Sequence, residues 1–259
     1  GTFLVYPAIW TIRLSLDRGR GLRFEQWVGL DNYKELLTDD PSFLDLHRFP
    51  PQGALVNNLK WMVLYTGLCI ALGLVLAVLA GRVRYERLVK ASVFVPMSIA
   101  ATAVGVIWLF VYSPDPHIGL LNAITTRLGA DPVSWVGRES TVNYAIIVAY
   151  VWFSAGFAMV VLSAALKGIS TEIVEAARVD GAGEWAVFRR ILMPMISLPL
   201  AVVAVWLIIN VIKVFDVIYI MTRGGPGASS RVIAYSMFFE TFENGRGGYG
   251  AAVAVVMLL

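Results

Sequence analysis

Long uninterrupted runs of apolar residues constrain this sequence more than any other feature. Four of them cover residues 54–81, 91–112, 142–166 and 197–221. About 20 apolar residues in a helix match the roughly 30 Å hydrocarbon core of a bilayer. A backbone inside lipid must also satisfy its own hydrogen bonds, and an α-helix does so. The runs therefore predict an all-α integral membrane protein.

The composition points the same way. Hydrophobic residues make up 58% of the chain and charged residues 15%, whereas soluble domains carry about 25% charged residues. The mean hydropathy is +0.71. The formal net charge of +3 is spread over several loops, which argues against a nucleic-acid-binding surface. The single cysteine, Cys69, lies inside an apolar run, so we expect neither an intrachain disulfide nor a cysteine metal cluster.

Two shorter apolar segments, 1–16 and 250–259, lie at the ends of the sequence. Ten residues of α-helix extend only about 15 Å, half the thickness of the bilayer interior. The first segment also lacks the basic start and the small-residue cleavage site of a signal peptide. We therefore expect one transmembrane domain over 1–259, with a first and a last span that are incomplete in this chain.

The basic residues indicate an orientation. Loops 82–90 and 167–196 carry eight Lys or Arg in 39 residues, whereas loops 17–54, 113–140 and 223–248 carry ten in 92. Basic residues are enriched in the cytoplasmic loops of membrane proteins. We therefore expect the first two loops in the cytoplasm and the other three outside.

The polar stretch 167–196 is the main interruption between long apolar runs. Ser170 or Thr171 can cap the start of a helix there, and Gly181 and Gly183 offer a stop. These residues predict a short helix of about two to three turns.

A second amphipathic helix is predicted to follow and to end at Pro194, which removes a backbone hydrogen bond from a helix. Ala176 and Ala177, on the first helix, would let a partner approach closely. The second helix would place apolar side chains on one face and charged ones on the other: Trp185, Phe188, Ile191 and Leu192 against Glu184, Arg189 and Arg190.

At these residues the sequence resembles the cytoplasmic EAA loop of bacterial ABC import permeases. The likeness consists of Glu175-Ala176-Ala177, then Gly181, then Ile191-Leu192-Met193-Pro194. The family usually has Leu where Met193 stands, a swap that keeps volume and apolarity. The resemblance implies a coupling helix that sits in a cleft of an ATP-hydrolysing subunit. The residues that it assigns to coupling are Glu175, Ala176, Ala177, Asp180, Gly181 and Pro194.

The resemblance extends over nearly the whole chain. Residues 27–33, the turn at 221–226 and residues 248–252 are similar to motifs of carbohydrate import permeases. Residues 82–86 and 160–168 look like those of α-glucoside permeases. The resemblance thus implies a type I ABC importer transmembrane domain of six family spans, with maltose, trehalose or sucrose as cargo. Other sugars and glycerol phosphates remain open.

The resemblance also implies partners. These are a second permease subunit, two ATP-binding subunits and an extracytoplasmic solute-binding protein, assembled on a multi-pass protein of the bacterial inner membrane. The chain has no phosphate-binding G-x-x-x-x-G-K-[ST] motif, no H-E-x-x-H and no G-x-S-x-G. We therefore expect a non-catalytic transport subunit without a cofactor, in contact with lipid, whose partner uses ATP and Mg.

The apolar run 197–221, the fifth when the segment 1–16 is counted first, holds candidate residues for a solute pathway. Trp206, Asn210 and Lys213 share one helical face, and Asp216 and Tyr219 follow further round. Polar residues inside a membrane usually face the bundle interior or water. In one interpretation Trp206, Asn210, Asp216 and Tyr219 line a sugar pathway. In the other, Lys213 and Asp216 form an ion pair near the outer interface and Trp206 packs against other helices.

Other classes of function are open at this point. A secondary transporter or channel without an ATPase could use Lys213 and Asp216 as a gate. The polar stretch could also be an amphipathic helix that lies on lipid. Asn57, Asn58 and Lys60, which open the second run, are interpreted as interface anchors and caps.

Overall fold

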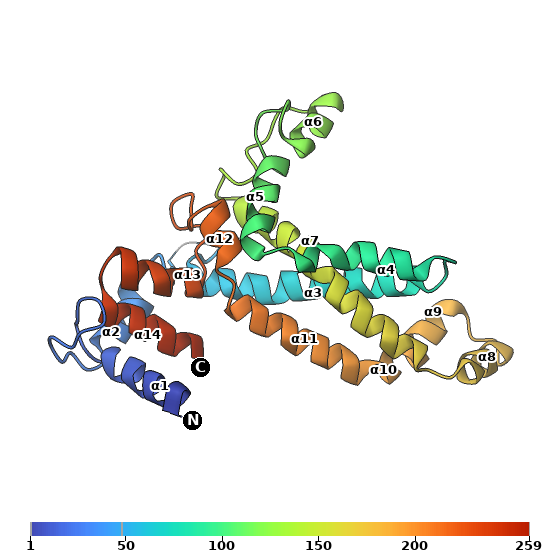
Figure 1. Cartoon of the computed structure of the whole chain (residues 1–259), viewed down its shortest axis with the longest axis horizontal. Helices are drawn as coiled ribbons and strands as arrows, with labels where there is room; N and C mark the ends of the chain where they lie inside the picture. The colour runs from blue at the N-terminus through green and yellow to red at the C-terminus, as the bar shows by residue number, and fades with distance from the viewer. Residues whose placement is uncertain (1, 48, 259) are drawn as a thin grey trace. The chain divides into compact units, whose positions relative to one another are not determined.

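The structure is a computed structural model that describes residues 2–47 and 49–258. Figure 1 shows a chain built of helices, and this confirms the predicted all-α class. In the described part, extended segments pair only at two isolated bridges, Asp17 with Trp27 and Asp45 with Gln52.

The chain folds as two compact units. Unit 1 comprises the described residues of Gly1–Trp61, Ala101–Ile147 and Val211–Leu259, and unit 2 comprises Met62–Ala100 and Val148–Asn210. The three loops that the charge pattern places outside all belong to unit 1, and the two that it places in the cytoplasm belong to unit 2.

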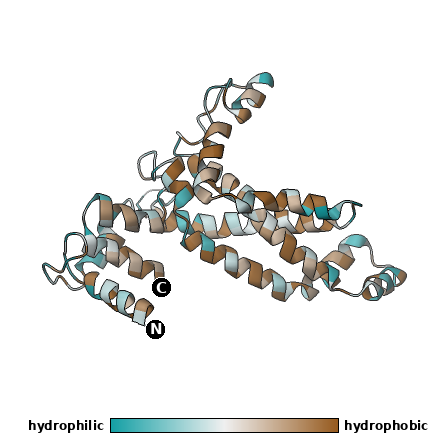
Figure 2. Cartoon of the chain, viewed as in Figure 1, coloured by the Kyte–Doolittle hydropathy of each residue, from teal (hydrophilic) through white to brown (hydrophobic). Residues whose placement is uncertain are grey.

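Two predicted spans are single long helices. Helix α3 covers Ala54–Ala80 and α7 covers Val142–Lys167, both long and apolar enough to cross a bilayer. Their bounds agree with the predicted runs to within one residue. Two bent helix pairs raise the number of candidate spans in the described part to four if each pair is one span. Figure 2 shows hydrophobic residues along most of α11, which belongs to one of these pairs.

The span predicted over 91–112 is a bent pair of helices. Helix α4 (Glu86–Phe94) runs into a 3₁₀ turn, η2 (Val95–Ser98), and α5 (Ala101–Val111) follows after a bend of 102°. Pro96 lies in the first turn of η2, where its missing N–H is tolerated. Pro96 predicts a kink, and the structure has a full break here.

The fifth run, 197–221, is also broken. Helix α11 covers Ser197–Ile212 and α12 covers Asp216–Met221. The Nδ2 atom of Asn58 donates to the carbonyl of Val211 at 3.3 Å, and the N–H of Val214 donates to the same oxygen at 3.2 Å. These donors occupy an oxygen that a continuous helix would give to residue 215, so the helical pattern stops.

Apart from those of the polar stretch 167–196, which are described below, the remaining helices are short, and most lie in the predicted loops or at the ends of the chain. Helix α14 begins at Gly247, three residues before the predicted start of the last span. In chain order they are α1 (Thr2–Leu14), α2 (Asp31–Lys34), η1 (Glu35–Asp39), α6 (Leu120–Arg127), α13 (Ile233–Phe238), η4 (Phe239–Glu243) and α14 (Gly247–Leu258).

A buried set of asparagines holds the segment 229–233 in unit 1. The Nδ2 atom of Asn57 donates to the carbonyls of Ser229 and Arg231, each at 2.8 Å, and Asn143 donates to Ser229 at 2.6 Å. The interpretation of Asn57 and Asn58 as interface anchors is therefore wrong, although Oδ1 of Asn58 accepts the N–H of Ile233, the first residue of α13, at 2.8 Å. Both asparagines are at most 2% exposed, because buried amides must find partners and the loop carbonyls supply them.

Small residues allow close helix packing in unit 2. A Cβ atom on Gly73 of α3 would lie 2.6 Å from the Cβ of Ala158 on α7. A Cβ on Gly156 would lie 2.6 Å from the carbonyl oxygen of Val93 on α4. Without a hydrophobic driving force between helices in lipid, such close approach supplies much of the packing energy.

Candidate functional site

The first helix of the polar stretch forms as predicted. Helix α8 covers Thr171–Val179, and the Oγ of Ser170 accepts a hydrogen bond from the N–H of Glu172 at 3.2 Å. This cap satisfies one of the orphan donors of the first turn. Glu172 also places a negative charge at the positive end of the helix dipole.

The end of α8 depends on Gly181. Its φ of +83° is in the left-handed region that favours glycine, and a Cβ at this position would meet no atom within 4 Å. The N–H of Gly181 donates to the carbonyl of Arg178, and the N–H of Ala182 donates to Ala177 at 2.9 Å. The turn therefore closes the helix with its carbonyls satisfied.

The second helix begins at Glu184 as α9 (Glu184–Val187) and continues through a π-helical turn, η3 (Phe188–Leu192), and α10 (Met193–Met195). The prediction that it ends at Pro194 is wrong by two residues. Pro194 lies in the first turn of α10, where no N–H is needed, and the break falls at Ile196. The axis then turns by 69° into α11.

An ion pair joins the two helices. Both Nε and Nη2 of Arg178 lie 2.9 Å from Oε1 of Glu184. Both side chains are more than half exposed, so the pair contributes little to stability and mainly sets the angle between α8 and α9. The sequence did not predict this ion pair, because its two residues lie on different helices, separated by Gly181 and Gly183.

A second ion pair ties the start of the polar stretch to the first residue of α4. The Nζ of Lys167 lies 2.6 Å from Oε2 of Glu86, and Lys90 pairs with the other oxygen. The i, i+4 spacing of Glu86 and Lys90 could have predicted the second contact. The contact with Lys167 joins residues 81 positions apart, and sequence reasoning missed it.

The surface of the helix pair combines unpaired charges with exposed apolar side chains. Glu175 and Asp180 are exposed, and within the described residues neither side chain makes a hydrogen bond or ion pair. Val179 is 88% exposed and Trp185 70%. Trp185 nevertheless stacks on Phe188 with ring centroids 5.5 Å apart, and both rings line an apolar hollow beside α3, as expected of residues on one apolar face.

Glu175 stands at the rim of a small cavity of about 190 Å³ in unit 2. Leu166, Ile169, Val174 and Leu192 provide its apolar lining. Ala176 is exposed and Ala177 half-buried on the same helix. A carboxylate above an apolar hollow, beside small residues, is the geometry of a docking surface for a protein partner.

The helical face predicted for Trp206, Asn210 and Lys213 is interrupted, because α11 ends at Ile212 and Lys213 lies outside it. Trp206 and Asn210 belong to α11 in unit 2, whereas Asp216 and Tyr219 belong to α12 in unit 1. The break at 213–215 separates the two pairs. The alternative ion pair between Lys213 and Asp216 is absent from the described part of the chain as well, since the helix that would bring them together ends at Ile212.

Each pathway residue already has a local role. The ring of Trp206 stacks on Phe157 with centroids 4.0 Å apart. The Nδ2 of Asn210 donates to the carbonyl of Trp206 at 2.8 Å, which leaves its Oδ1 as an acceptor. Tyr219 stacks on Phe215, and Asp216 is the exposed first residue of α12.

Comparison with known proteins gives the chain its family. The model of the binding-protein-dependent transport system inner membrane component matches residues 69–259. The chain is 44% identical to the osmoprotective compounds uptake permease protein GgtC of Synechocystis sp., an alignment that covers 99% of this chain and 88% of that protein. It is 38% identical to the alpha-glucoside transport system permease protein AglF of Rhizobium meliloti, over 99% of this chain and 74% of that protein.

A solved structure gives the fold independently. A chain of a bacterial ABC transporter involved in alginate import superposes with a TM-score of 0.79, covering 99% of this chain and 86% of that chain at 24% identity. The likeness confirms the transmembrane-domain fold of an ABC importer. The relatives are permease proteins, and ATP hydrolysis belongs to a separate subunit. This chain therefore belongs to the family of binding-protein-dependent transport system inner membrane components, the permease subunits of ABC importers.

Proposed function

We propose that this chain carries a sugar through the bacterial inner membrane as the permease subunit of an ATP-driven importer. The cargo in this proposal is an α-glucoside such as maltose, trehalose or sucrose. The observation that carries it is the 38% identity, over 99% of the chain, to a permease named for α-glucoside transport. A trehalose/maltose permease of Thermococcus litoralis, 29% identical over 98% of the chain, adds support.

The stretch 167–196 is proposed as the coupling segment, seated in a groove of the ATP-binding subunit. A surface that exposes Val179 and Trp185 to water is unfavourable unless something covers it. The charges of Glu175 and Asp180 at its edge can fix the register of a partner. The Arg178–Glu184 pair, at 2.9 Å, would let the two helices move as one lever when the ATPase dimer closes.

The proposed assembly contains a second permease subunit, two ATP-binding subunits that use ATP and Mg, and an extracytoplasmic solute-binding protein. Closure of the ATPase dimer would drive the spans from an inward-open to an outward-open state. The solute-binding protein would then release its sugar at loops 17–54, 113–140 and 223–248. A related fold solved with a bound periplasmic protein supports this arrangement.

The experiment uses the whole complex in vesicles. We would measure ATP hydrolysis with the solute-binding protein loaded with maltose, trehalose, sucrose or glycerol phosphate. We expect one of the three glucosides to stimulate hydrolysis by at least about five-fold, the lower end of typical coupling energies, and glycerol phosphate to give none. Stimulation by glycerol phosphate alone would assign a non-sugar cargo. Solute uptake without any ATPase would overturn the importer.

For the pathway, we propose that Trp206, Asn210, Asp216 and Tyr219 contact the passing sugar. The most accessible test is Asn210→Ala, because Oδ1 of Asn210 is left free to accept a hydroxyl. Loss of one such hydrogen bond should raise the KM of transport by about three- to ten-fold with the maximal rate little changed. Ile209→Ala is the matched control, since Ile209 is the neighbouring, 43% exposed residue. Equal effects of both substitutions would remove Asn210 from the pathway.

A further inference from the structure

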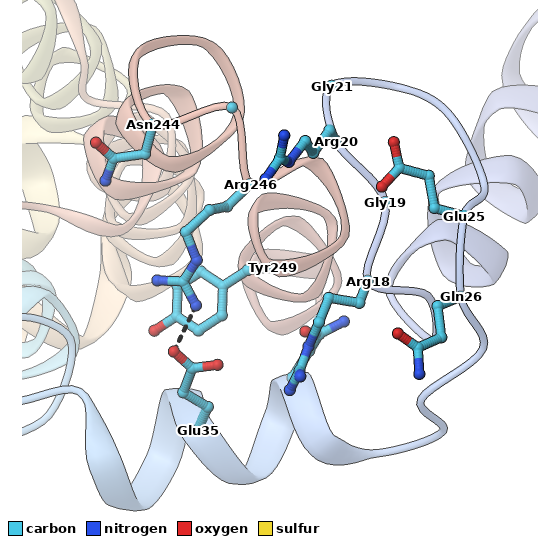
Figure 3. Close-up of a pocket in the computed structure, with 12 residues that line it drawn as sticks. Arg18, Gly19, Arg20, Gly21, Glu25, Gln26, Glu35, Asn244, Arg246 and Tyr249 are labelled. Carbon is cyan, nitrogen blue, oxygen red and sulfur yellow. Dashed lines mark hydrogen bonds and ion pairs between the residues drawn. The ribbon is translucent and has the colours of Figure 1, made fainter.

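A polar pocket in unit 1 has no role in the proposed transport cycle. Its volume is about 880 Å³, and it lies between the loop that follows α1 and the start of α14 (Figure 3). Three arginines line it, Arg18, Arg20 and Arg246, together with two acidic residues, Glu25 and Glu35. The lining charges therefore sum to +1.

Of the three arginines, Arg246 has acidic partners, whereas Arg18 and Arg20 do not among the residues that the structure describes. Nη2 of Arg246 lies 2.5 Å from Oε1 of Glu35, and Nη1 lies 3.4 Å from Oε2 of the buried Glu240. Its guanidinium also covers the ring of Tyr249 at 4.0 Å. Arg18 and Arg20, in contrast, make no side-chain hydrogen bond or ion pair among residues 2–47 and 49–258. Arg18 and Arg20 thus line the pocket together with Glu25, whose carboxylate is bonded to neither of them in the described part of the chain, and these three side chains sum to +1.

The loop that carries these arginines is held rigidly. The N–H of Arg18 donates to the carbonyl of Gln26 at 2.7 Å, and the N–H of Gly21 donates to Gly245 at 2.9 Å. The buried amide of Asn32 donates to the carbonyls of Ser15 and Asp17, at 2.8 and 2.9 Å. The backbone of the loop at Arg18 and Arg20 is therefore held in place before any ligand binds, and only the side chains have to be ordered on binding.

The helix that precedes the pocket loop exposes an apolar face. Helix α1 ends four residues before Arg18 and exposes large apolar side chains, among them Ile9, which is 60% exposed. The rings of Trp10 and Phe24 are 4.6 Å apart, so an aromatic pair joins this helix to the loop. Tryptophan is enriched at the level of lipid headgroups.

We propose that the pocket binds the phosphate of an anionic phospholipid headgroup, with Arg18 and Arg20 as the groups that recognise it. Guanidinium groups suit phosphate because their N–H donors can bond two oxygens at once. The acyl chains would lie along the exposed face of α1. The proposal uses the membrane setting of the family and is independent of the sugar assignment.

The experiment titrates the purified complex, in neutral detergent, with short-chain phosphatidylglycerol, phosphatidylcholine or inorganic phosphate and records the thermal unfolding midpoint. A ligand that binds only the folded state raises this midpoint as its concentration passes Kd. We expect phosphatidylglycerol to bind about ten-fold more tightly than phosphatidylcholine, since the choline cation is repelled by the arginines. The double variant Arg18→Gln, Arg20→Gln should lose that preference.

Arg23→Gln is the matched control, because Arg23 is exposed on the same loop and does not line the pocket. It should keep the preference for phosphatidylglycerol. Equal binding of the two lipids, or an equal loss in Arg23→Gln, would overturn the proposal. Saturation by inorganic phosphate at the same affinity would assign the pocket to a free anion. A variant whose only defect is weaker docking of the solute-binding protein would assign it to a protein carboxylate.

Discussion

Glu175→Lys is expected to reduce solute-stimulated ATP hydrolysis by at least about ten-fold, to the level without solute. Glu175 is exposed, makes no ion pair in the described part of the chain and stands at the rim of the apolar cavity beside α8. In the proposed complex, Glu175→Lys would place a positive charge in the groove of the ATP-binding subunit at the position of the carboxylate. A charge left buried and unpaired at an interface costs about 2–5 kcal/mol, which exceeds the 1.4 kcal/mol that a ten-fold change requires.

The measurement is ATP hydrolysis by the complex in vesicles, with and without the loaded solute-binding protein. Glu243→Lys is the control, because it makes the same charge change at an exposed residue of a loop predicted to lie outside. It should retain stimulation. The amount of each variant in the membrane should be unchanged, since neither side chain is buried. Full stimulation of the Glu175→Lys complex would falsify the coupling role.

Gly181→Trp tests the same surface by a different physical route. An L residue at φ +83° is strained by about 1–2 kcal/mol. The new Cβ atom would nevertheless meet no atom within 4 Å, and Gly181 is exposed, so the fold should persist. Its bulk would separate the coupling segment from the ATPase. We expect normal insertion with stimulated hydrolysis lost, and a variant that stimulates normally would exclude close contact at Gly181.

The features of this fold that could be predicted are fixed by residues close to them in the sequence. The bounds of α3 and α7 follow from the length of their apolar runs, and the start of α8 follows from the Ser170 cap. The same holds for Gly181, whose turn needs a residue that tolerates positive φ. In each case the determining residues lie within a few positions of the feature.

The features that could not be predicted depend on contacts between residues far apart in the sequence. The break after α11 coincides with a hydrogen bond from Asn58, 153 residues away, to the carbonyl of Val211. No proline or glycine occupies 213–215, so the apolar pattern predicts a continuous helix. The prediction that Lys213 shares a helical face with Trp206 and Asn210 failed for this reason. Burial of Asn57 was equally unpredictable, because its partners are carbonyls of the segment 229–233.

Close backbone contacts of Gly247 and Gly248 in unit 1 predict that Gly247→Val strongly destabilises the protein. A Cβ atom on Gly247 would lie 1.3 Å from the carbonyl oxygen of Gly21, and one on Gly248 would lie 1.8 Å from that of Asp17. Real Cβ contacts are never this short, and both obstacles are backbone atoms that cannot rotate away. Gly247→Val must therefore displace the whole loop from the start of α14.

The expected cost of Gly247→Val is at least about 3 kcal/mol, the upper range for overpacking a tight site. Displacing the loop would break the hydrogen bonds from Gly21 to Gly245 and from Gly248 to Gly19. Thermal unfolding of the purified protein, followed by tryptophan fluorescence, measures the effect.

Gly67→Ala is the control, because a Cβ there meets nothing within 4 Å and the backbone is helical. It should be neutral or stabilising by about 0.5–1 kcal/mol, the usual gain of alanine over glycine in a helix. If Gly247→Val and Gly67→Ala unfolded at the same temperature, the loop could not be packed on the start of α14 as the backbone contacts require. The three arginines would then have no fixed framework, so this stability measurement also tests the premise on which the lipid pocket depends.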